Sequence, residues 1–364
     1  MQTYPIPMVP GPVTVPEEIL NACRIDYGAA DLEPDFLDCH AETASGLQRV
    51  LGTRSQVVIA TGEGMLALWS ALKSCLVPGD RVVSVATGVF GDGIAEMAKA
   101  IGADVRTVGL PYDQTLGDLA DVEAAVAEHR PKMITAVHCE TPSGTLNPMA
   151  DLGALKARYG VPLLYVDAVS SAGGTPVAAD EWGIDLALGG SQKCLSAPPG
   201  MAFLSVSEAA WEAIEAVDYV GYDALKPFRT APLTGYFPYT PFWQGVAALR
   251  VAVRWILDEG LEAVFERHER VAADCRRRLA EMGLSLFPAP GAISSPTVTA
   301  VKVPEGITWE TLDARLRERG LVVGGSYGPM AGRIFRLGHM GSQADPTRLD
   351  QALDVLAAVT AELG

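Results

Sequence analysis

Residues 185–194, Asp-Leu-Ala-Leu-Gly-Gly-Ser-Gln-Lys-Cys, combine a short apolar segment with a glycine-serine loop that carries Lys193. Other short apolar, strand-like runs lie upstream of it, at residues 56–60, 81–86, 104–108, 133–137 and 162–166. Amphipathic stretches with apolar residues at three- and four-residue spacing separate these runs, for example at residues 64–76, 91–101 and 119–129. This alternation predicts an α/β fold whose mostly parallel sheet is covered by helices on both faces.

A second, smaller unit is predicted at the carboxyl end of the chain. A long amphipathic stretch runs from about residue 245 to 282, and residues 297–303 and 321–323 follow it as strand-like segments. We therefore expect an N-terminal arm at residues 1–20, a large domain at residues 21–250 and a small α/β domain at residues 251–364, with the linking helix near 245–282. Residues 224–241, rich in proline and aromatic side chains, are expected to form an ordered loop, and loops of this length are usually functional or interfacial.

Composition limits the classes of function. The 364 residues are 49% hydrophobic and carry a formal net charge of -16, which disfavours binding to nucleic acid or to an anionic membrane surface. The six cysteines are far apart, and neither they nor the five histidines have metal-ligand spacing, so no metal is predicted. There is no secretory signal and no apolar run of membrane-spanning length. We expect a cytoplasmic protein with reduced thiols and a small-molecule ligand.

Lys193 gains meaning from an acidic residue upstream. A lone lysine in a glycine-serine loop is usually a solvated surface group. Residues 165–171, Tyr-Val-Asp-Ala-Val-Ser-Ser, however, end a second apolar strand with Asp167. An acid at the carboxyl end of such a strand points into a binding crevice. Pyridoxal chemistry needs this pair, because a lysine amine forms a Schiff base and a carboxylate keeps the pyridine nitrogen protonated.

Two further segments extend the pattern: residues 60–65, Ala-Thr-Gly-Glu-Gly-Met, and residues 138–145, His-Cys-Glu-Thr-Pro-Ser-Gly-Thr. With Asp167 and Lys193, they resemble the class V aminotransferases of fold type I. The resemblance runs from Pro-Gly-Pro at residues 10–12 to Arg-Leu-Gly-His-Met-Gly at residues 336–341. Within this family, residues 141–145, 193–200 and 295–297 look most like the pyridoxamine:pyruvate aminotransferases.

The resemblance implies the architecture and the assembly. It predicts a large domain with a mostly parallel sheet of the seven-stranded type, and a small C-terminal α/β domain. It also predicts a homodimer or homotetramer whose active sites lie at the subunit interface.

The resemblance also implies roles for individual residues. Lys193 would form the Schiff base and move the proton, Asp167 would contact the ring nitrogen, and Phe90 would stack on the ring. Thr141 and Ser143 would reach the phenolic oxygen. The structural alternatives are that Phe90 belongs to the core and that the two hydroxyl residues only shape their turn.

The substrate carboxylate is expected at Arg336, whose guanidinium can bind it as a bidentate fork; the alternative is a surface charge. Pyridoxamine:pyruvate enzymes have a second arginine about nine residues earlier, where this chain has Tyr327, and Arg333 is nearby but out of register. One fork and a tyrosine hydroxyl still suit a small monocarboxylate such as pyruvate.

Glu63, which is followed by Gly64, is expected to distinguish phosphorylated from unphosphorylated forms of vitamin B6. Phosphate-using relatives have a small hydroxyl residue at this position, at a helix N-terminus that receives the phosphate. A carboxylate repels a phosphate dianion. In a partly desolvated site this repulsion is on the order of several kcal/mol. It can also accept a hydrogen bond from the hydroxymethyl group of an unphosphorylated ring. The alternative is that Glu63 only caps the helix. Gln192, Tyr239 and Thr240 match phosphate-binding positions and favour the phosphorylated cofactor.

The predicted reaction transfers the amino group of pyridoxamine to pyruvate, giving pyridoxal and L-alanine, as in vitamin B6 degradation. Pyridoxal or pyridoxamine would then be a substrate bound at Lys193. Two alternatives remain. One is a transaminase that uses pyridoxal 5′-phosphate with alanine or serine as donor and glyoxylate or pyruvate as acceptor. The other is a vitamin B6-binding protein without turnover.

Overall fold

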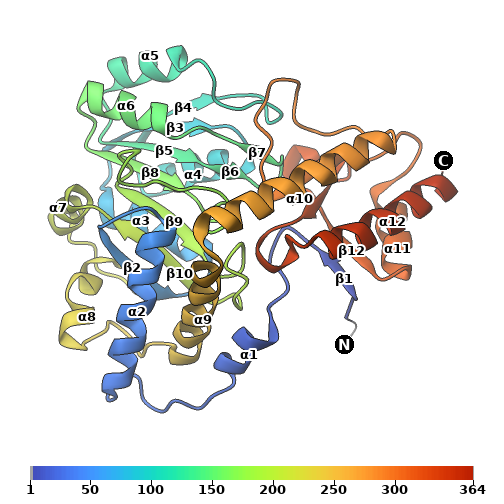
Figure 1. Ribbon diagram of the computed structural model, residues 1–364. Helices are drawn as coiled ribbons and strands as arrows, with labels where there is room; N and C mark the ends of the chain where they lie inside the picture. The colour runs from blue at the N-terminus through green and yellow to red at the C-terminus, as the bar shows by residue number, and fades with distance from the viewer. Residues whose placement is uncertain (1–2, 364) are drawn as a thin grey trace.

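The computed structural model describes residues 3–363, which form two sheets of unequal size with helices around each (Figure 1). The larger sheet has seven strands in the order β2-β10-β9-β8-β5-β3-β4. These strands are β2 (Gln56–Thr61), β3 (Arg81–Ala86), β4 (Asp104–Gly109), β5 (Met133–Val137), β8 (Leu163–Asp167), β9 (Leu186–Gly190) and β10 (Met201–Val206). The smaller sheet has the order β1-β12-β13-β11 and contains β1 (Ile6–Met8), β11 (Val298–Lys302), β12 (Leu321–Gly325) and β13 (Ile334–Gly338).

The predicted α/β fold is confirmed. Each apolar run predicted as a strand of the large sheet forms one, and the pairs β4–β3, β3–β5, β5–β8 and β8–β9 are parallel. Strand β10 was not predicted, and it is antiparallel to both of its neighbours, β2 and β9. All six residues of β10 are buried, so its sequence has none of the polar alternation of a half-exposed strand.

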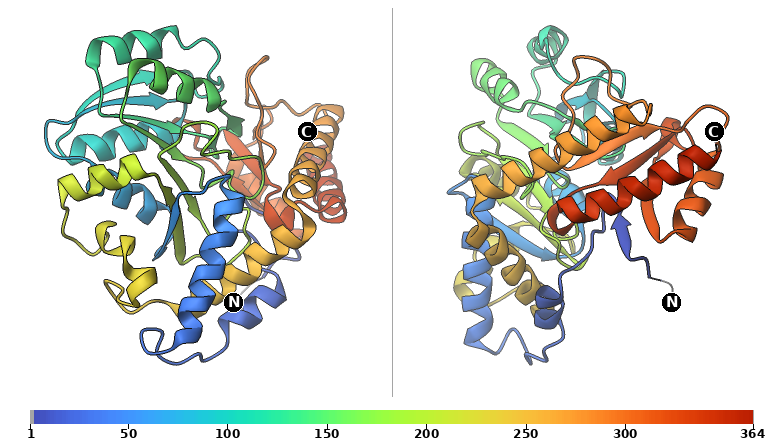
Figure 2. Two further views of the ribbon diagram at one scale, coloured as in Figure 1. Left: turned by 60° about the vertical axis from the view of Figure 1, so that its left-hand side comes forward. Right: turned by 45° about the vertical axis from the view of Figure 1, so that its right-hand side comes forward.

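Helices cover both faces of the large sheet, as predicted (Figure 2). Alternate residues of a strand point to opposite faces, so Val58 packs with one set of helices and Val57 with the other. The first set is α3 (Gly64–Cys75), α4 (Val89–Ala100) and α7 (Glu208–Val217). The second set is α2 (Pro34–Val50), α5 (Ala120–His129), α6 (Ala150–Tyr159) and α9 (Trp243–Glu259).

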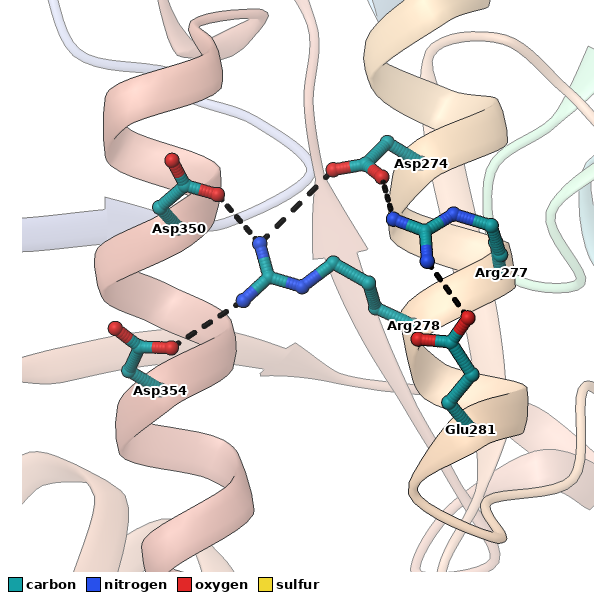
Figure 3. A network of polar contacts seen from close by, with 6 residues as sticks. All are labelled: Asp274, Arg277, Arg278, Glu281, Asp350 and Asp354. Atoms are coloured by element: carbon teal, nitrogen blue, oxygen red, sulfur yellow. Dashed lines mark hydrogen bonds and ion pairs between the residues drawn. The ribbon is translucent and has the colours of Figure 1, made fainter.

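The long amphipathic stretch near residues 245–282 is two helices, α9 and α10 (Leu261–Glu281), because the chain breaks at Gly260. The φ angle of Gly260 is 90°, which favours glycine. Helix α10 leads from the large sheet to the small one (Figure 1). It packs there with α12 (Pro346–Leu363), and Arg278 joins the exposed carboxylates of Asp350 and Asp354 (Figure 3). Such exposed pairs contribute little stability, so the apolar contacts beneath them hold the two helices together.

The N-terminal arm connects the two sheets. Its strand β1 pairs in parallel with β12, so residues from opposite ends of the chain share the small sheet. Helix α1 (Glu17–Cys23) follows and packs on α9. Beyond these, the chain forms β6 (Cys139–Glu140), β7 (Thr145–Leu146) and α11 (Trp309–Glu318).

The expected loop at 224–241 contains two short helical turns, η1 (Lys226–Arg229) and α8 (Ala231–Thr234). Further 3-10 turns lie at Gly328–Met330 and Gly341–Gln343. Within residues 3–363, no helix is both long and apolar enough to cross a membrane.

Candidate active site

The carboxyl ends of the parallel strands β5, β8 and β9 meet at one edge of the large sheet. Asp167 is the last residue of β8, and Lys193 follows the end of β9. A cavity of about 130 Å³ lies at this edge. Seven of its lining residues were predicted from the sequence: Glu63, Gly64, Phe90, Thr141, Asp167, Gln192 and Lys193. Five were not: Met65, Leu68, Cys139, Val169 and Ser170.

Lys193 is tied to the N-terminal arm. Its Nζ donates a hydrogen bond to the carbonyl oxygen of Pro10 over 2.7 Å. Burial lowers the pKa of the Lys193 amine, and the positive charge of Arg336 lowers it further. The neutral, nucleophilic form of this amine is therefore more populated than in an exposed lysine.

Asp167 has a fixed orientation beside this amine. Its Oδ1 accepts a hydrogen bond of 2.8 Å from the backbone N–H of Val169. Burial raises the pKa of Asp167 to about 6, while the Val169 bond and the charge of Lys193 act in the opposite direction. The carboxylate is therefore mostly ionised at pH 7 and able to hold a positive charge on a bound ring.

Glu63 combines the two interpretations offered by the sequence. It is the N-cap of α3, and its Oε1 accepts from the backbone N–H of Met65 over 2.9 Å. Its Oε2 accepts from Nε2 of Gln192 over 3.1 Å. The residue thus caps the helix and also presents its carboxylate to the cavity.

Phe90 lies in the first turn of α4, where a buried acid holds the backbone. Glu140 Oε2 accepts from the N–H of Phe90 over 3.2 Å, and Oε1 accepts from the N–H of Gly91 over 2.8 Å. Burial raises the pKa of Glu140 to about 8, the two N–H donors lower it, and Asp167 contributes a further increase. Glu140 lies within residues 138–145, but the sequence predicted no role for it. The only available signal was an acid in an otherwise uncharged strand-end segment.

The two predicted hydroxyl residues separate in the structure. Thr141 lines the cavity and its Oγ1 is hydrogen-bonded to Oγ of Ser170. Ser143 does not line it. Its Oγ donates to the carbonyl oxygen of Glu140 over 3.3 Å and lies 2.8 Å from Oγ1 of Thr145. The turn that precedes β7 therefore uses the Ser143 hydroxyl internally.

Arg336 is buried, with 3% of its surface exposed, so it is not a surface charge. Strand β13 carries it, and its Nε donates to the carbonyl oxygen of Gly325 over 2.7 Å. Its Nη1 donates to the carbonyl oxygen of Thr141 over 3.3 Å, next to the cavity. The guanidinium also lies 4.9 Å from the ring centre of Tyr327. Among the described residues no carboxylate pairs with Arg336, which leaves its charge available to an anionic substrate.

Tyr239 and Thr240 lie outside the cavity. The hydroxyl of Tyr239 accepts from the backbone N–H of Thr61, close to Glu63 in the sequence, over 3.0 Å. Its ring stacks on Tyr222 with 4.6 Å between centroids. Both Tyr239 and Thr240 border a separate hollow of about 390 Å³. Within one copy of the chain, neither residue lines the cavity, and only Tyr239 is linked to its glutamate end, through Thr61.

A lysine and an acid at neighbouring strand ends, with a buried arginine beside them, are the groups that a vitamin B6-dependent transaminase needs. The sequence model of the family "Aminotransferase class-V" matches residues 21–334, most of the chain. The chain belongs to this family. Class V aminotransferases depend on pyridoxal 5′-phosphate, and the two-sheet fold described above is their fold-type-I architecture.

Relatives of this class V aminotransferase differ in their substrates. A pyridoxamine–pyruvate transaminase of Mesorhizobium japonicum is 33% identical over 373 residues, which cover 98% of this chain and 93% of the relative. An alanine–glyoxylate aminotransferase of Oryctolagus cuniculus is also 33% identical, over 95% of this chain and 90% of that protein. The crystal structure of pyridoxamine-pyruvate aminotransferase from Mesorhizobium loti matches with a TM-score of 0.94 and 32% identity, covering 100% of this chain and 93% of that one. Equal identity to enzymes with different amino donors means that the site itself has to indicate the substrate.

Proposed function

We propose that this class V aminotransferase transfers the amino group of pyridoxamine to pyruvate, releasing pyridoxal and L-alanine. The observation that carries the proposal is the carboxylate of Glu63, which lines the cavity at the N-terminus of α3, where phosphate-using relatives receive the cofactor phosphate. A phosphate dianion there would meet a negative charge. The sequence predicted a partly desolvated position, but Glu63 is exposed in one copy of the chain, so solvent weakens this repulsion without removing it. A hydroxymethyl group would instead donate a hydrogen bond to it.

The other residues of the cavity fit a vitamin B6 ring. A bound pyridoxamine supplies the amine and a ring that accepts electrons. Asp167 keeps the ring nitrogen protonated, because its carboxylate is ionised at neutral pH and held by the Val169 N–H. Phe90 and Val169 both line the cavity and are available to contact the ring faces.

Lys193 transfers the proton, and Arg336 binds the carboxylate of the keto acid. The Nζ of Lys193, with its lowered pKa, accepts a proton from the amine-bearing carbon and returns one to the α-carbon of the product. Arg336 orients the keto acid through its carboxylate, and Tyr327 covers the guanidinium. A single buried arginine suits a monocarboxylate, so pyruvate is favoured over a dicarboxylate.

A second candidate is a transaminase that keeps pyridoxal 5′-phosphate bound and uses alanine or serine with glyoxylate or pyruvate. Family membership favours it, and so do Gln192 at the cavity and Tyr239, which is hydrogen-bonded to the backbone of Thr61. In this case Glu63 would act only as the cap of α3.

The two candidates are separated by one assay. Purified protein without added cofactor is mixed with pyruvate and either pyridoxamine or pyridoxamine 5′-phosphate, and both pyridoxal and alanine are measured. We expect turnover with free pyridoxamine and little with the phosphate. Activity only after addition of pyridoxal 5′-phosphate, with an amino acid as donor, would overturn the first proposal in favour of the second.

We also propose that two copies of the chain pair through the segment at 220–242, as homodimer or as half of a homotetramer. Large apolar side chains are exposed there, among them Leu233 at 86% and Tyr236 at 80%. Several exposed large apolar side chains within one segment are typical of an interaction site. Pairing would place this segment next to the active site of the partner copy.

A further inference from the structure

Helix α4 begins without a side-chain cap of its own. Its N-cap residue is Gly88, which has no side chain to accept a hydrogen bond from the free N–H groups of the first turn. The N–H groups of Phe90 and Gly91 donate instead to the carboxyl group of Glu140, which is 50 and 49 positions away in the chain. Phe90 and Gly91 are the second and third residues of the helix, whose N–H groups an N-cap side chain normally satisfies. Glu140 on β6 therefore takes the place of the missing cap.

Gly88 leaves the space that this carboxyl group occupies. A Cβ on Gly88 would be 2.5 Å from Cδ and 2.6 Å from Oε2 of Glu140, so any other residue would have to displace the carboxyl group. The backbone itself does not require glycine here, because a φ angle of -178° is extended and open to every residue. The contact with Glu140, and not the turn, therefore explains the glycine at this position.

Glu140 also fixes the turn that follows it. Its carbonyl oxygen accepts from the backbone N–H of Gly144 over 2.9 Å and from that of Ser143 over 3.3 Å. Thr141 lies inside this turn and lines the cavity, and its carbonyl oxygen accepts from Nη1 of Arg336. One fully buried residue thus joins the start of α4 to the segment beside the substrate arginine.

The position of Phe90 depends on the first turn of α4. Phe90 lines the cavity from this turn, and the ends of helices fray when their N–H groups have no acceptor. Farther along the helix, Ile94 and Met97 are buried in the core and hold α4 on the sheet. Loss of the cap would therefore let the Phe90 ring move while the rest of the helix stays in place.

We propose that Glu140 is a positioning residue, which caps α4 from β6 and so holds Phe90 against the ring of a bound vitamer. Glu140 does not line the cavity itself, so it acts through Phe90 and not by touching the ligand. The inference concerns the ring and not its hydroxymethyl or phosphate substituent. It is therefore independent of the choice between the two candidate functions.

The test moves the cap from Glu140 to position 88 in the full-length protein. In Glu140→Ala, the two N–H groups lose their acceptor and the space beside Gly88 becomes free. Adding Gly88→Ser then supplies a hydroxyl that can accept from the same N–H groups as an ordinary N-cap. The variants are Glu140→Ala, Gly88→Ser and the double variant. Gly93→Ser is the matched control, because it makes the same exchange in the same helix, where a Cβ meets no other atom within 4 Å.

Binding of pyridoxine and of pyridoxine 5′-phosphate is measured by titration calorimetry, and each variant is compared with the wild type for the same probe. Neither probe has an aldehyde or an amine, so binding does not need Schiff-base chemistry at Lys193. We expect Glu140→Ala to weaken binding about tenfold, and Gly88→Ser alone to weaken it because the serine displaces a buried carboxyl group. The double variant should bind within about threefold of the wild type. Gly93→Ser should neither change binding nor rescue Glu140→Ala.

A cycle with Phe90→Leu separates positioning from a general loss of structure. If Glu140 acts through Phe90, Glu140→Ala should weaken binding about tenfold in the wild-type background and less than about twofold in the Phe90→Leu background. Equal losses in both backgrounds would overturn the inference, and so would a double variant with Gly88→Ser that binds no better than Glu140→Ala.

A second measurement applies if Glu140→Ala does not fold. Recovery of folded protein on addition of Gly88→Ser, but not of Gly93→Ser, then becomes the expected result, and recovery with neither would overturn the inference. Glu140→Gln replaces Glu140→Ala in the cycle with Phe90→Leu. Its amide keeps the length of the side chain and offers one acceptor oxygen to the two N–H groups.

Discussion

The amine of Lys193 donates a hydrogen bond to the carbonyl oxygen of Pro10, although the two residues are 183 positions apart in the chain. The next residue, Gly11, lies directly against the same side chain. A Cβ on Gly11 would be 2.5 Å from Cδ and 2.6 Å from Nζ of Lys193. The N-terminal arm therefore sets the space in which the lysine can move.

A methyl group at Gly11 should therefore affect catalysis more than folding. The Gly11→Ala variant would displace the flexible end of Lys193, and the φ angle of 95° adds strain of about 1 kcal/mol. We expect kcat to fall about tenfold or more, with a loss of only a few degrees in Tm. Kinetics and thermal unfolding check this together. Gly28→Ala has an equally positive φ angle and open space, so it reports the strain without the contact.

The charge of Asp167 can be tested apart from its hydrogen bond. Asn at this position keeps an oxygen that accepts from Val169, while it removes the negative charge. We expect Asp167→Asn to lower kcat about 10²- to 10³-fold and to keep the Tm close to that of the wild type. Asp167→Ala should lose a similar amount of activity and some stability. An Asn variant that turns over at the wild-type rate would exclude Asp167 from the mechanism.

Glu140 predicts a pH dependence of stability. Its pKa is raised from 4.5 to about 8, so the folded protein holds a proton that the unfolded chain releases. The contribution of Glu140 to the free energy of unfolding is fully present below about pH 4.5 and is lost as the pH rises toward 8. The loss is on the order of a few kcal/mol.

In Glu140→Gln this contribution is absent, so we expect its Tm to fall less than that of the wild type between pH 5.5 and pH 8. The amide cannot accept from both Phe90 and Gly91, which lowers stability equally at every pH, so the slope is the informative quantity. Thermal unfolding of both proteins without ligand gives it. Parallel pH profiles would mean that Glu140 does not titrate in this range.

The planar pair of N–H donors on the Arg336 guanidinium should contribute more to binding of the keto acid than its positive charge alone. Arg336→Lys keeps a cation but loses the planar pair of donors, so we expect kcat/KM for pyruvate to fall roughly 10- to 100-fold. Arg333→Lys makes the same change at an exposed neighbour on the chain and should leave kinetics unchanged. Steady-state assays with varied pyruvate check both variants. An unchanged KM and kcat in Arg336→Lys would show that the carboxylate binds elsewhere.

A single substitution can test the proposed pairing of two chains. Leu233→Glu places a charge in the exposed apolar segment, and we expect it to shift the protein toward monomer at micromolar concentration. Light scattering coupled to size exclusion measures the mass. Val77→Glu alters another exposed apolar side chain, outside this segment, and should not change it. A wild-type protein that is already monomeric would contradict the assembly.

Much of the fold and of the site could be predicted, because strand ends at one edge of a parallel sheet bring together residues that are distant in sequence. Asp167 and Lys193 follow from this rule, and so does the cavity between them. Strand β10 did not follow from it, since a fully buried strand has no alternation that separates it from a buried helix.

Glu140 was missed for a different reason. Its donors, Phe90 and Gly91, are about 50 positions away, and nothing local indicates that backbone N–H groups would satisfy a buried carboxylate there. The hydrogen bond from Gln192 to Glu63 likewise joins two residues that are 129 positions apart. Contacts of this kind are properties of the assembled structure and have no signature in a single segment.

The pairing of β1 with β12 has a consequence for synthesis. Ile6 leaves the ribosome early, but its partner Leu321 is made when most of the chain is already complete. The large sheet and its helices can fold in the meantime, because their contacts lie within earlier residues. The segment with Pro10 must wait unpaired, and Lys193 acquires its backbone acceptor only at the end. A nascent chain should therefore be structured long before it is competent for catalysis.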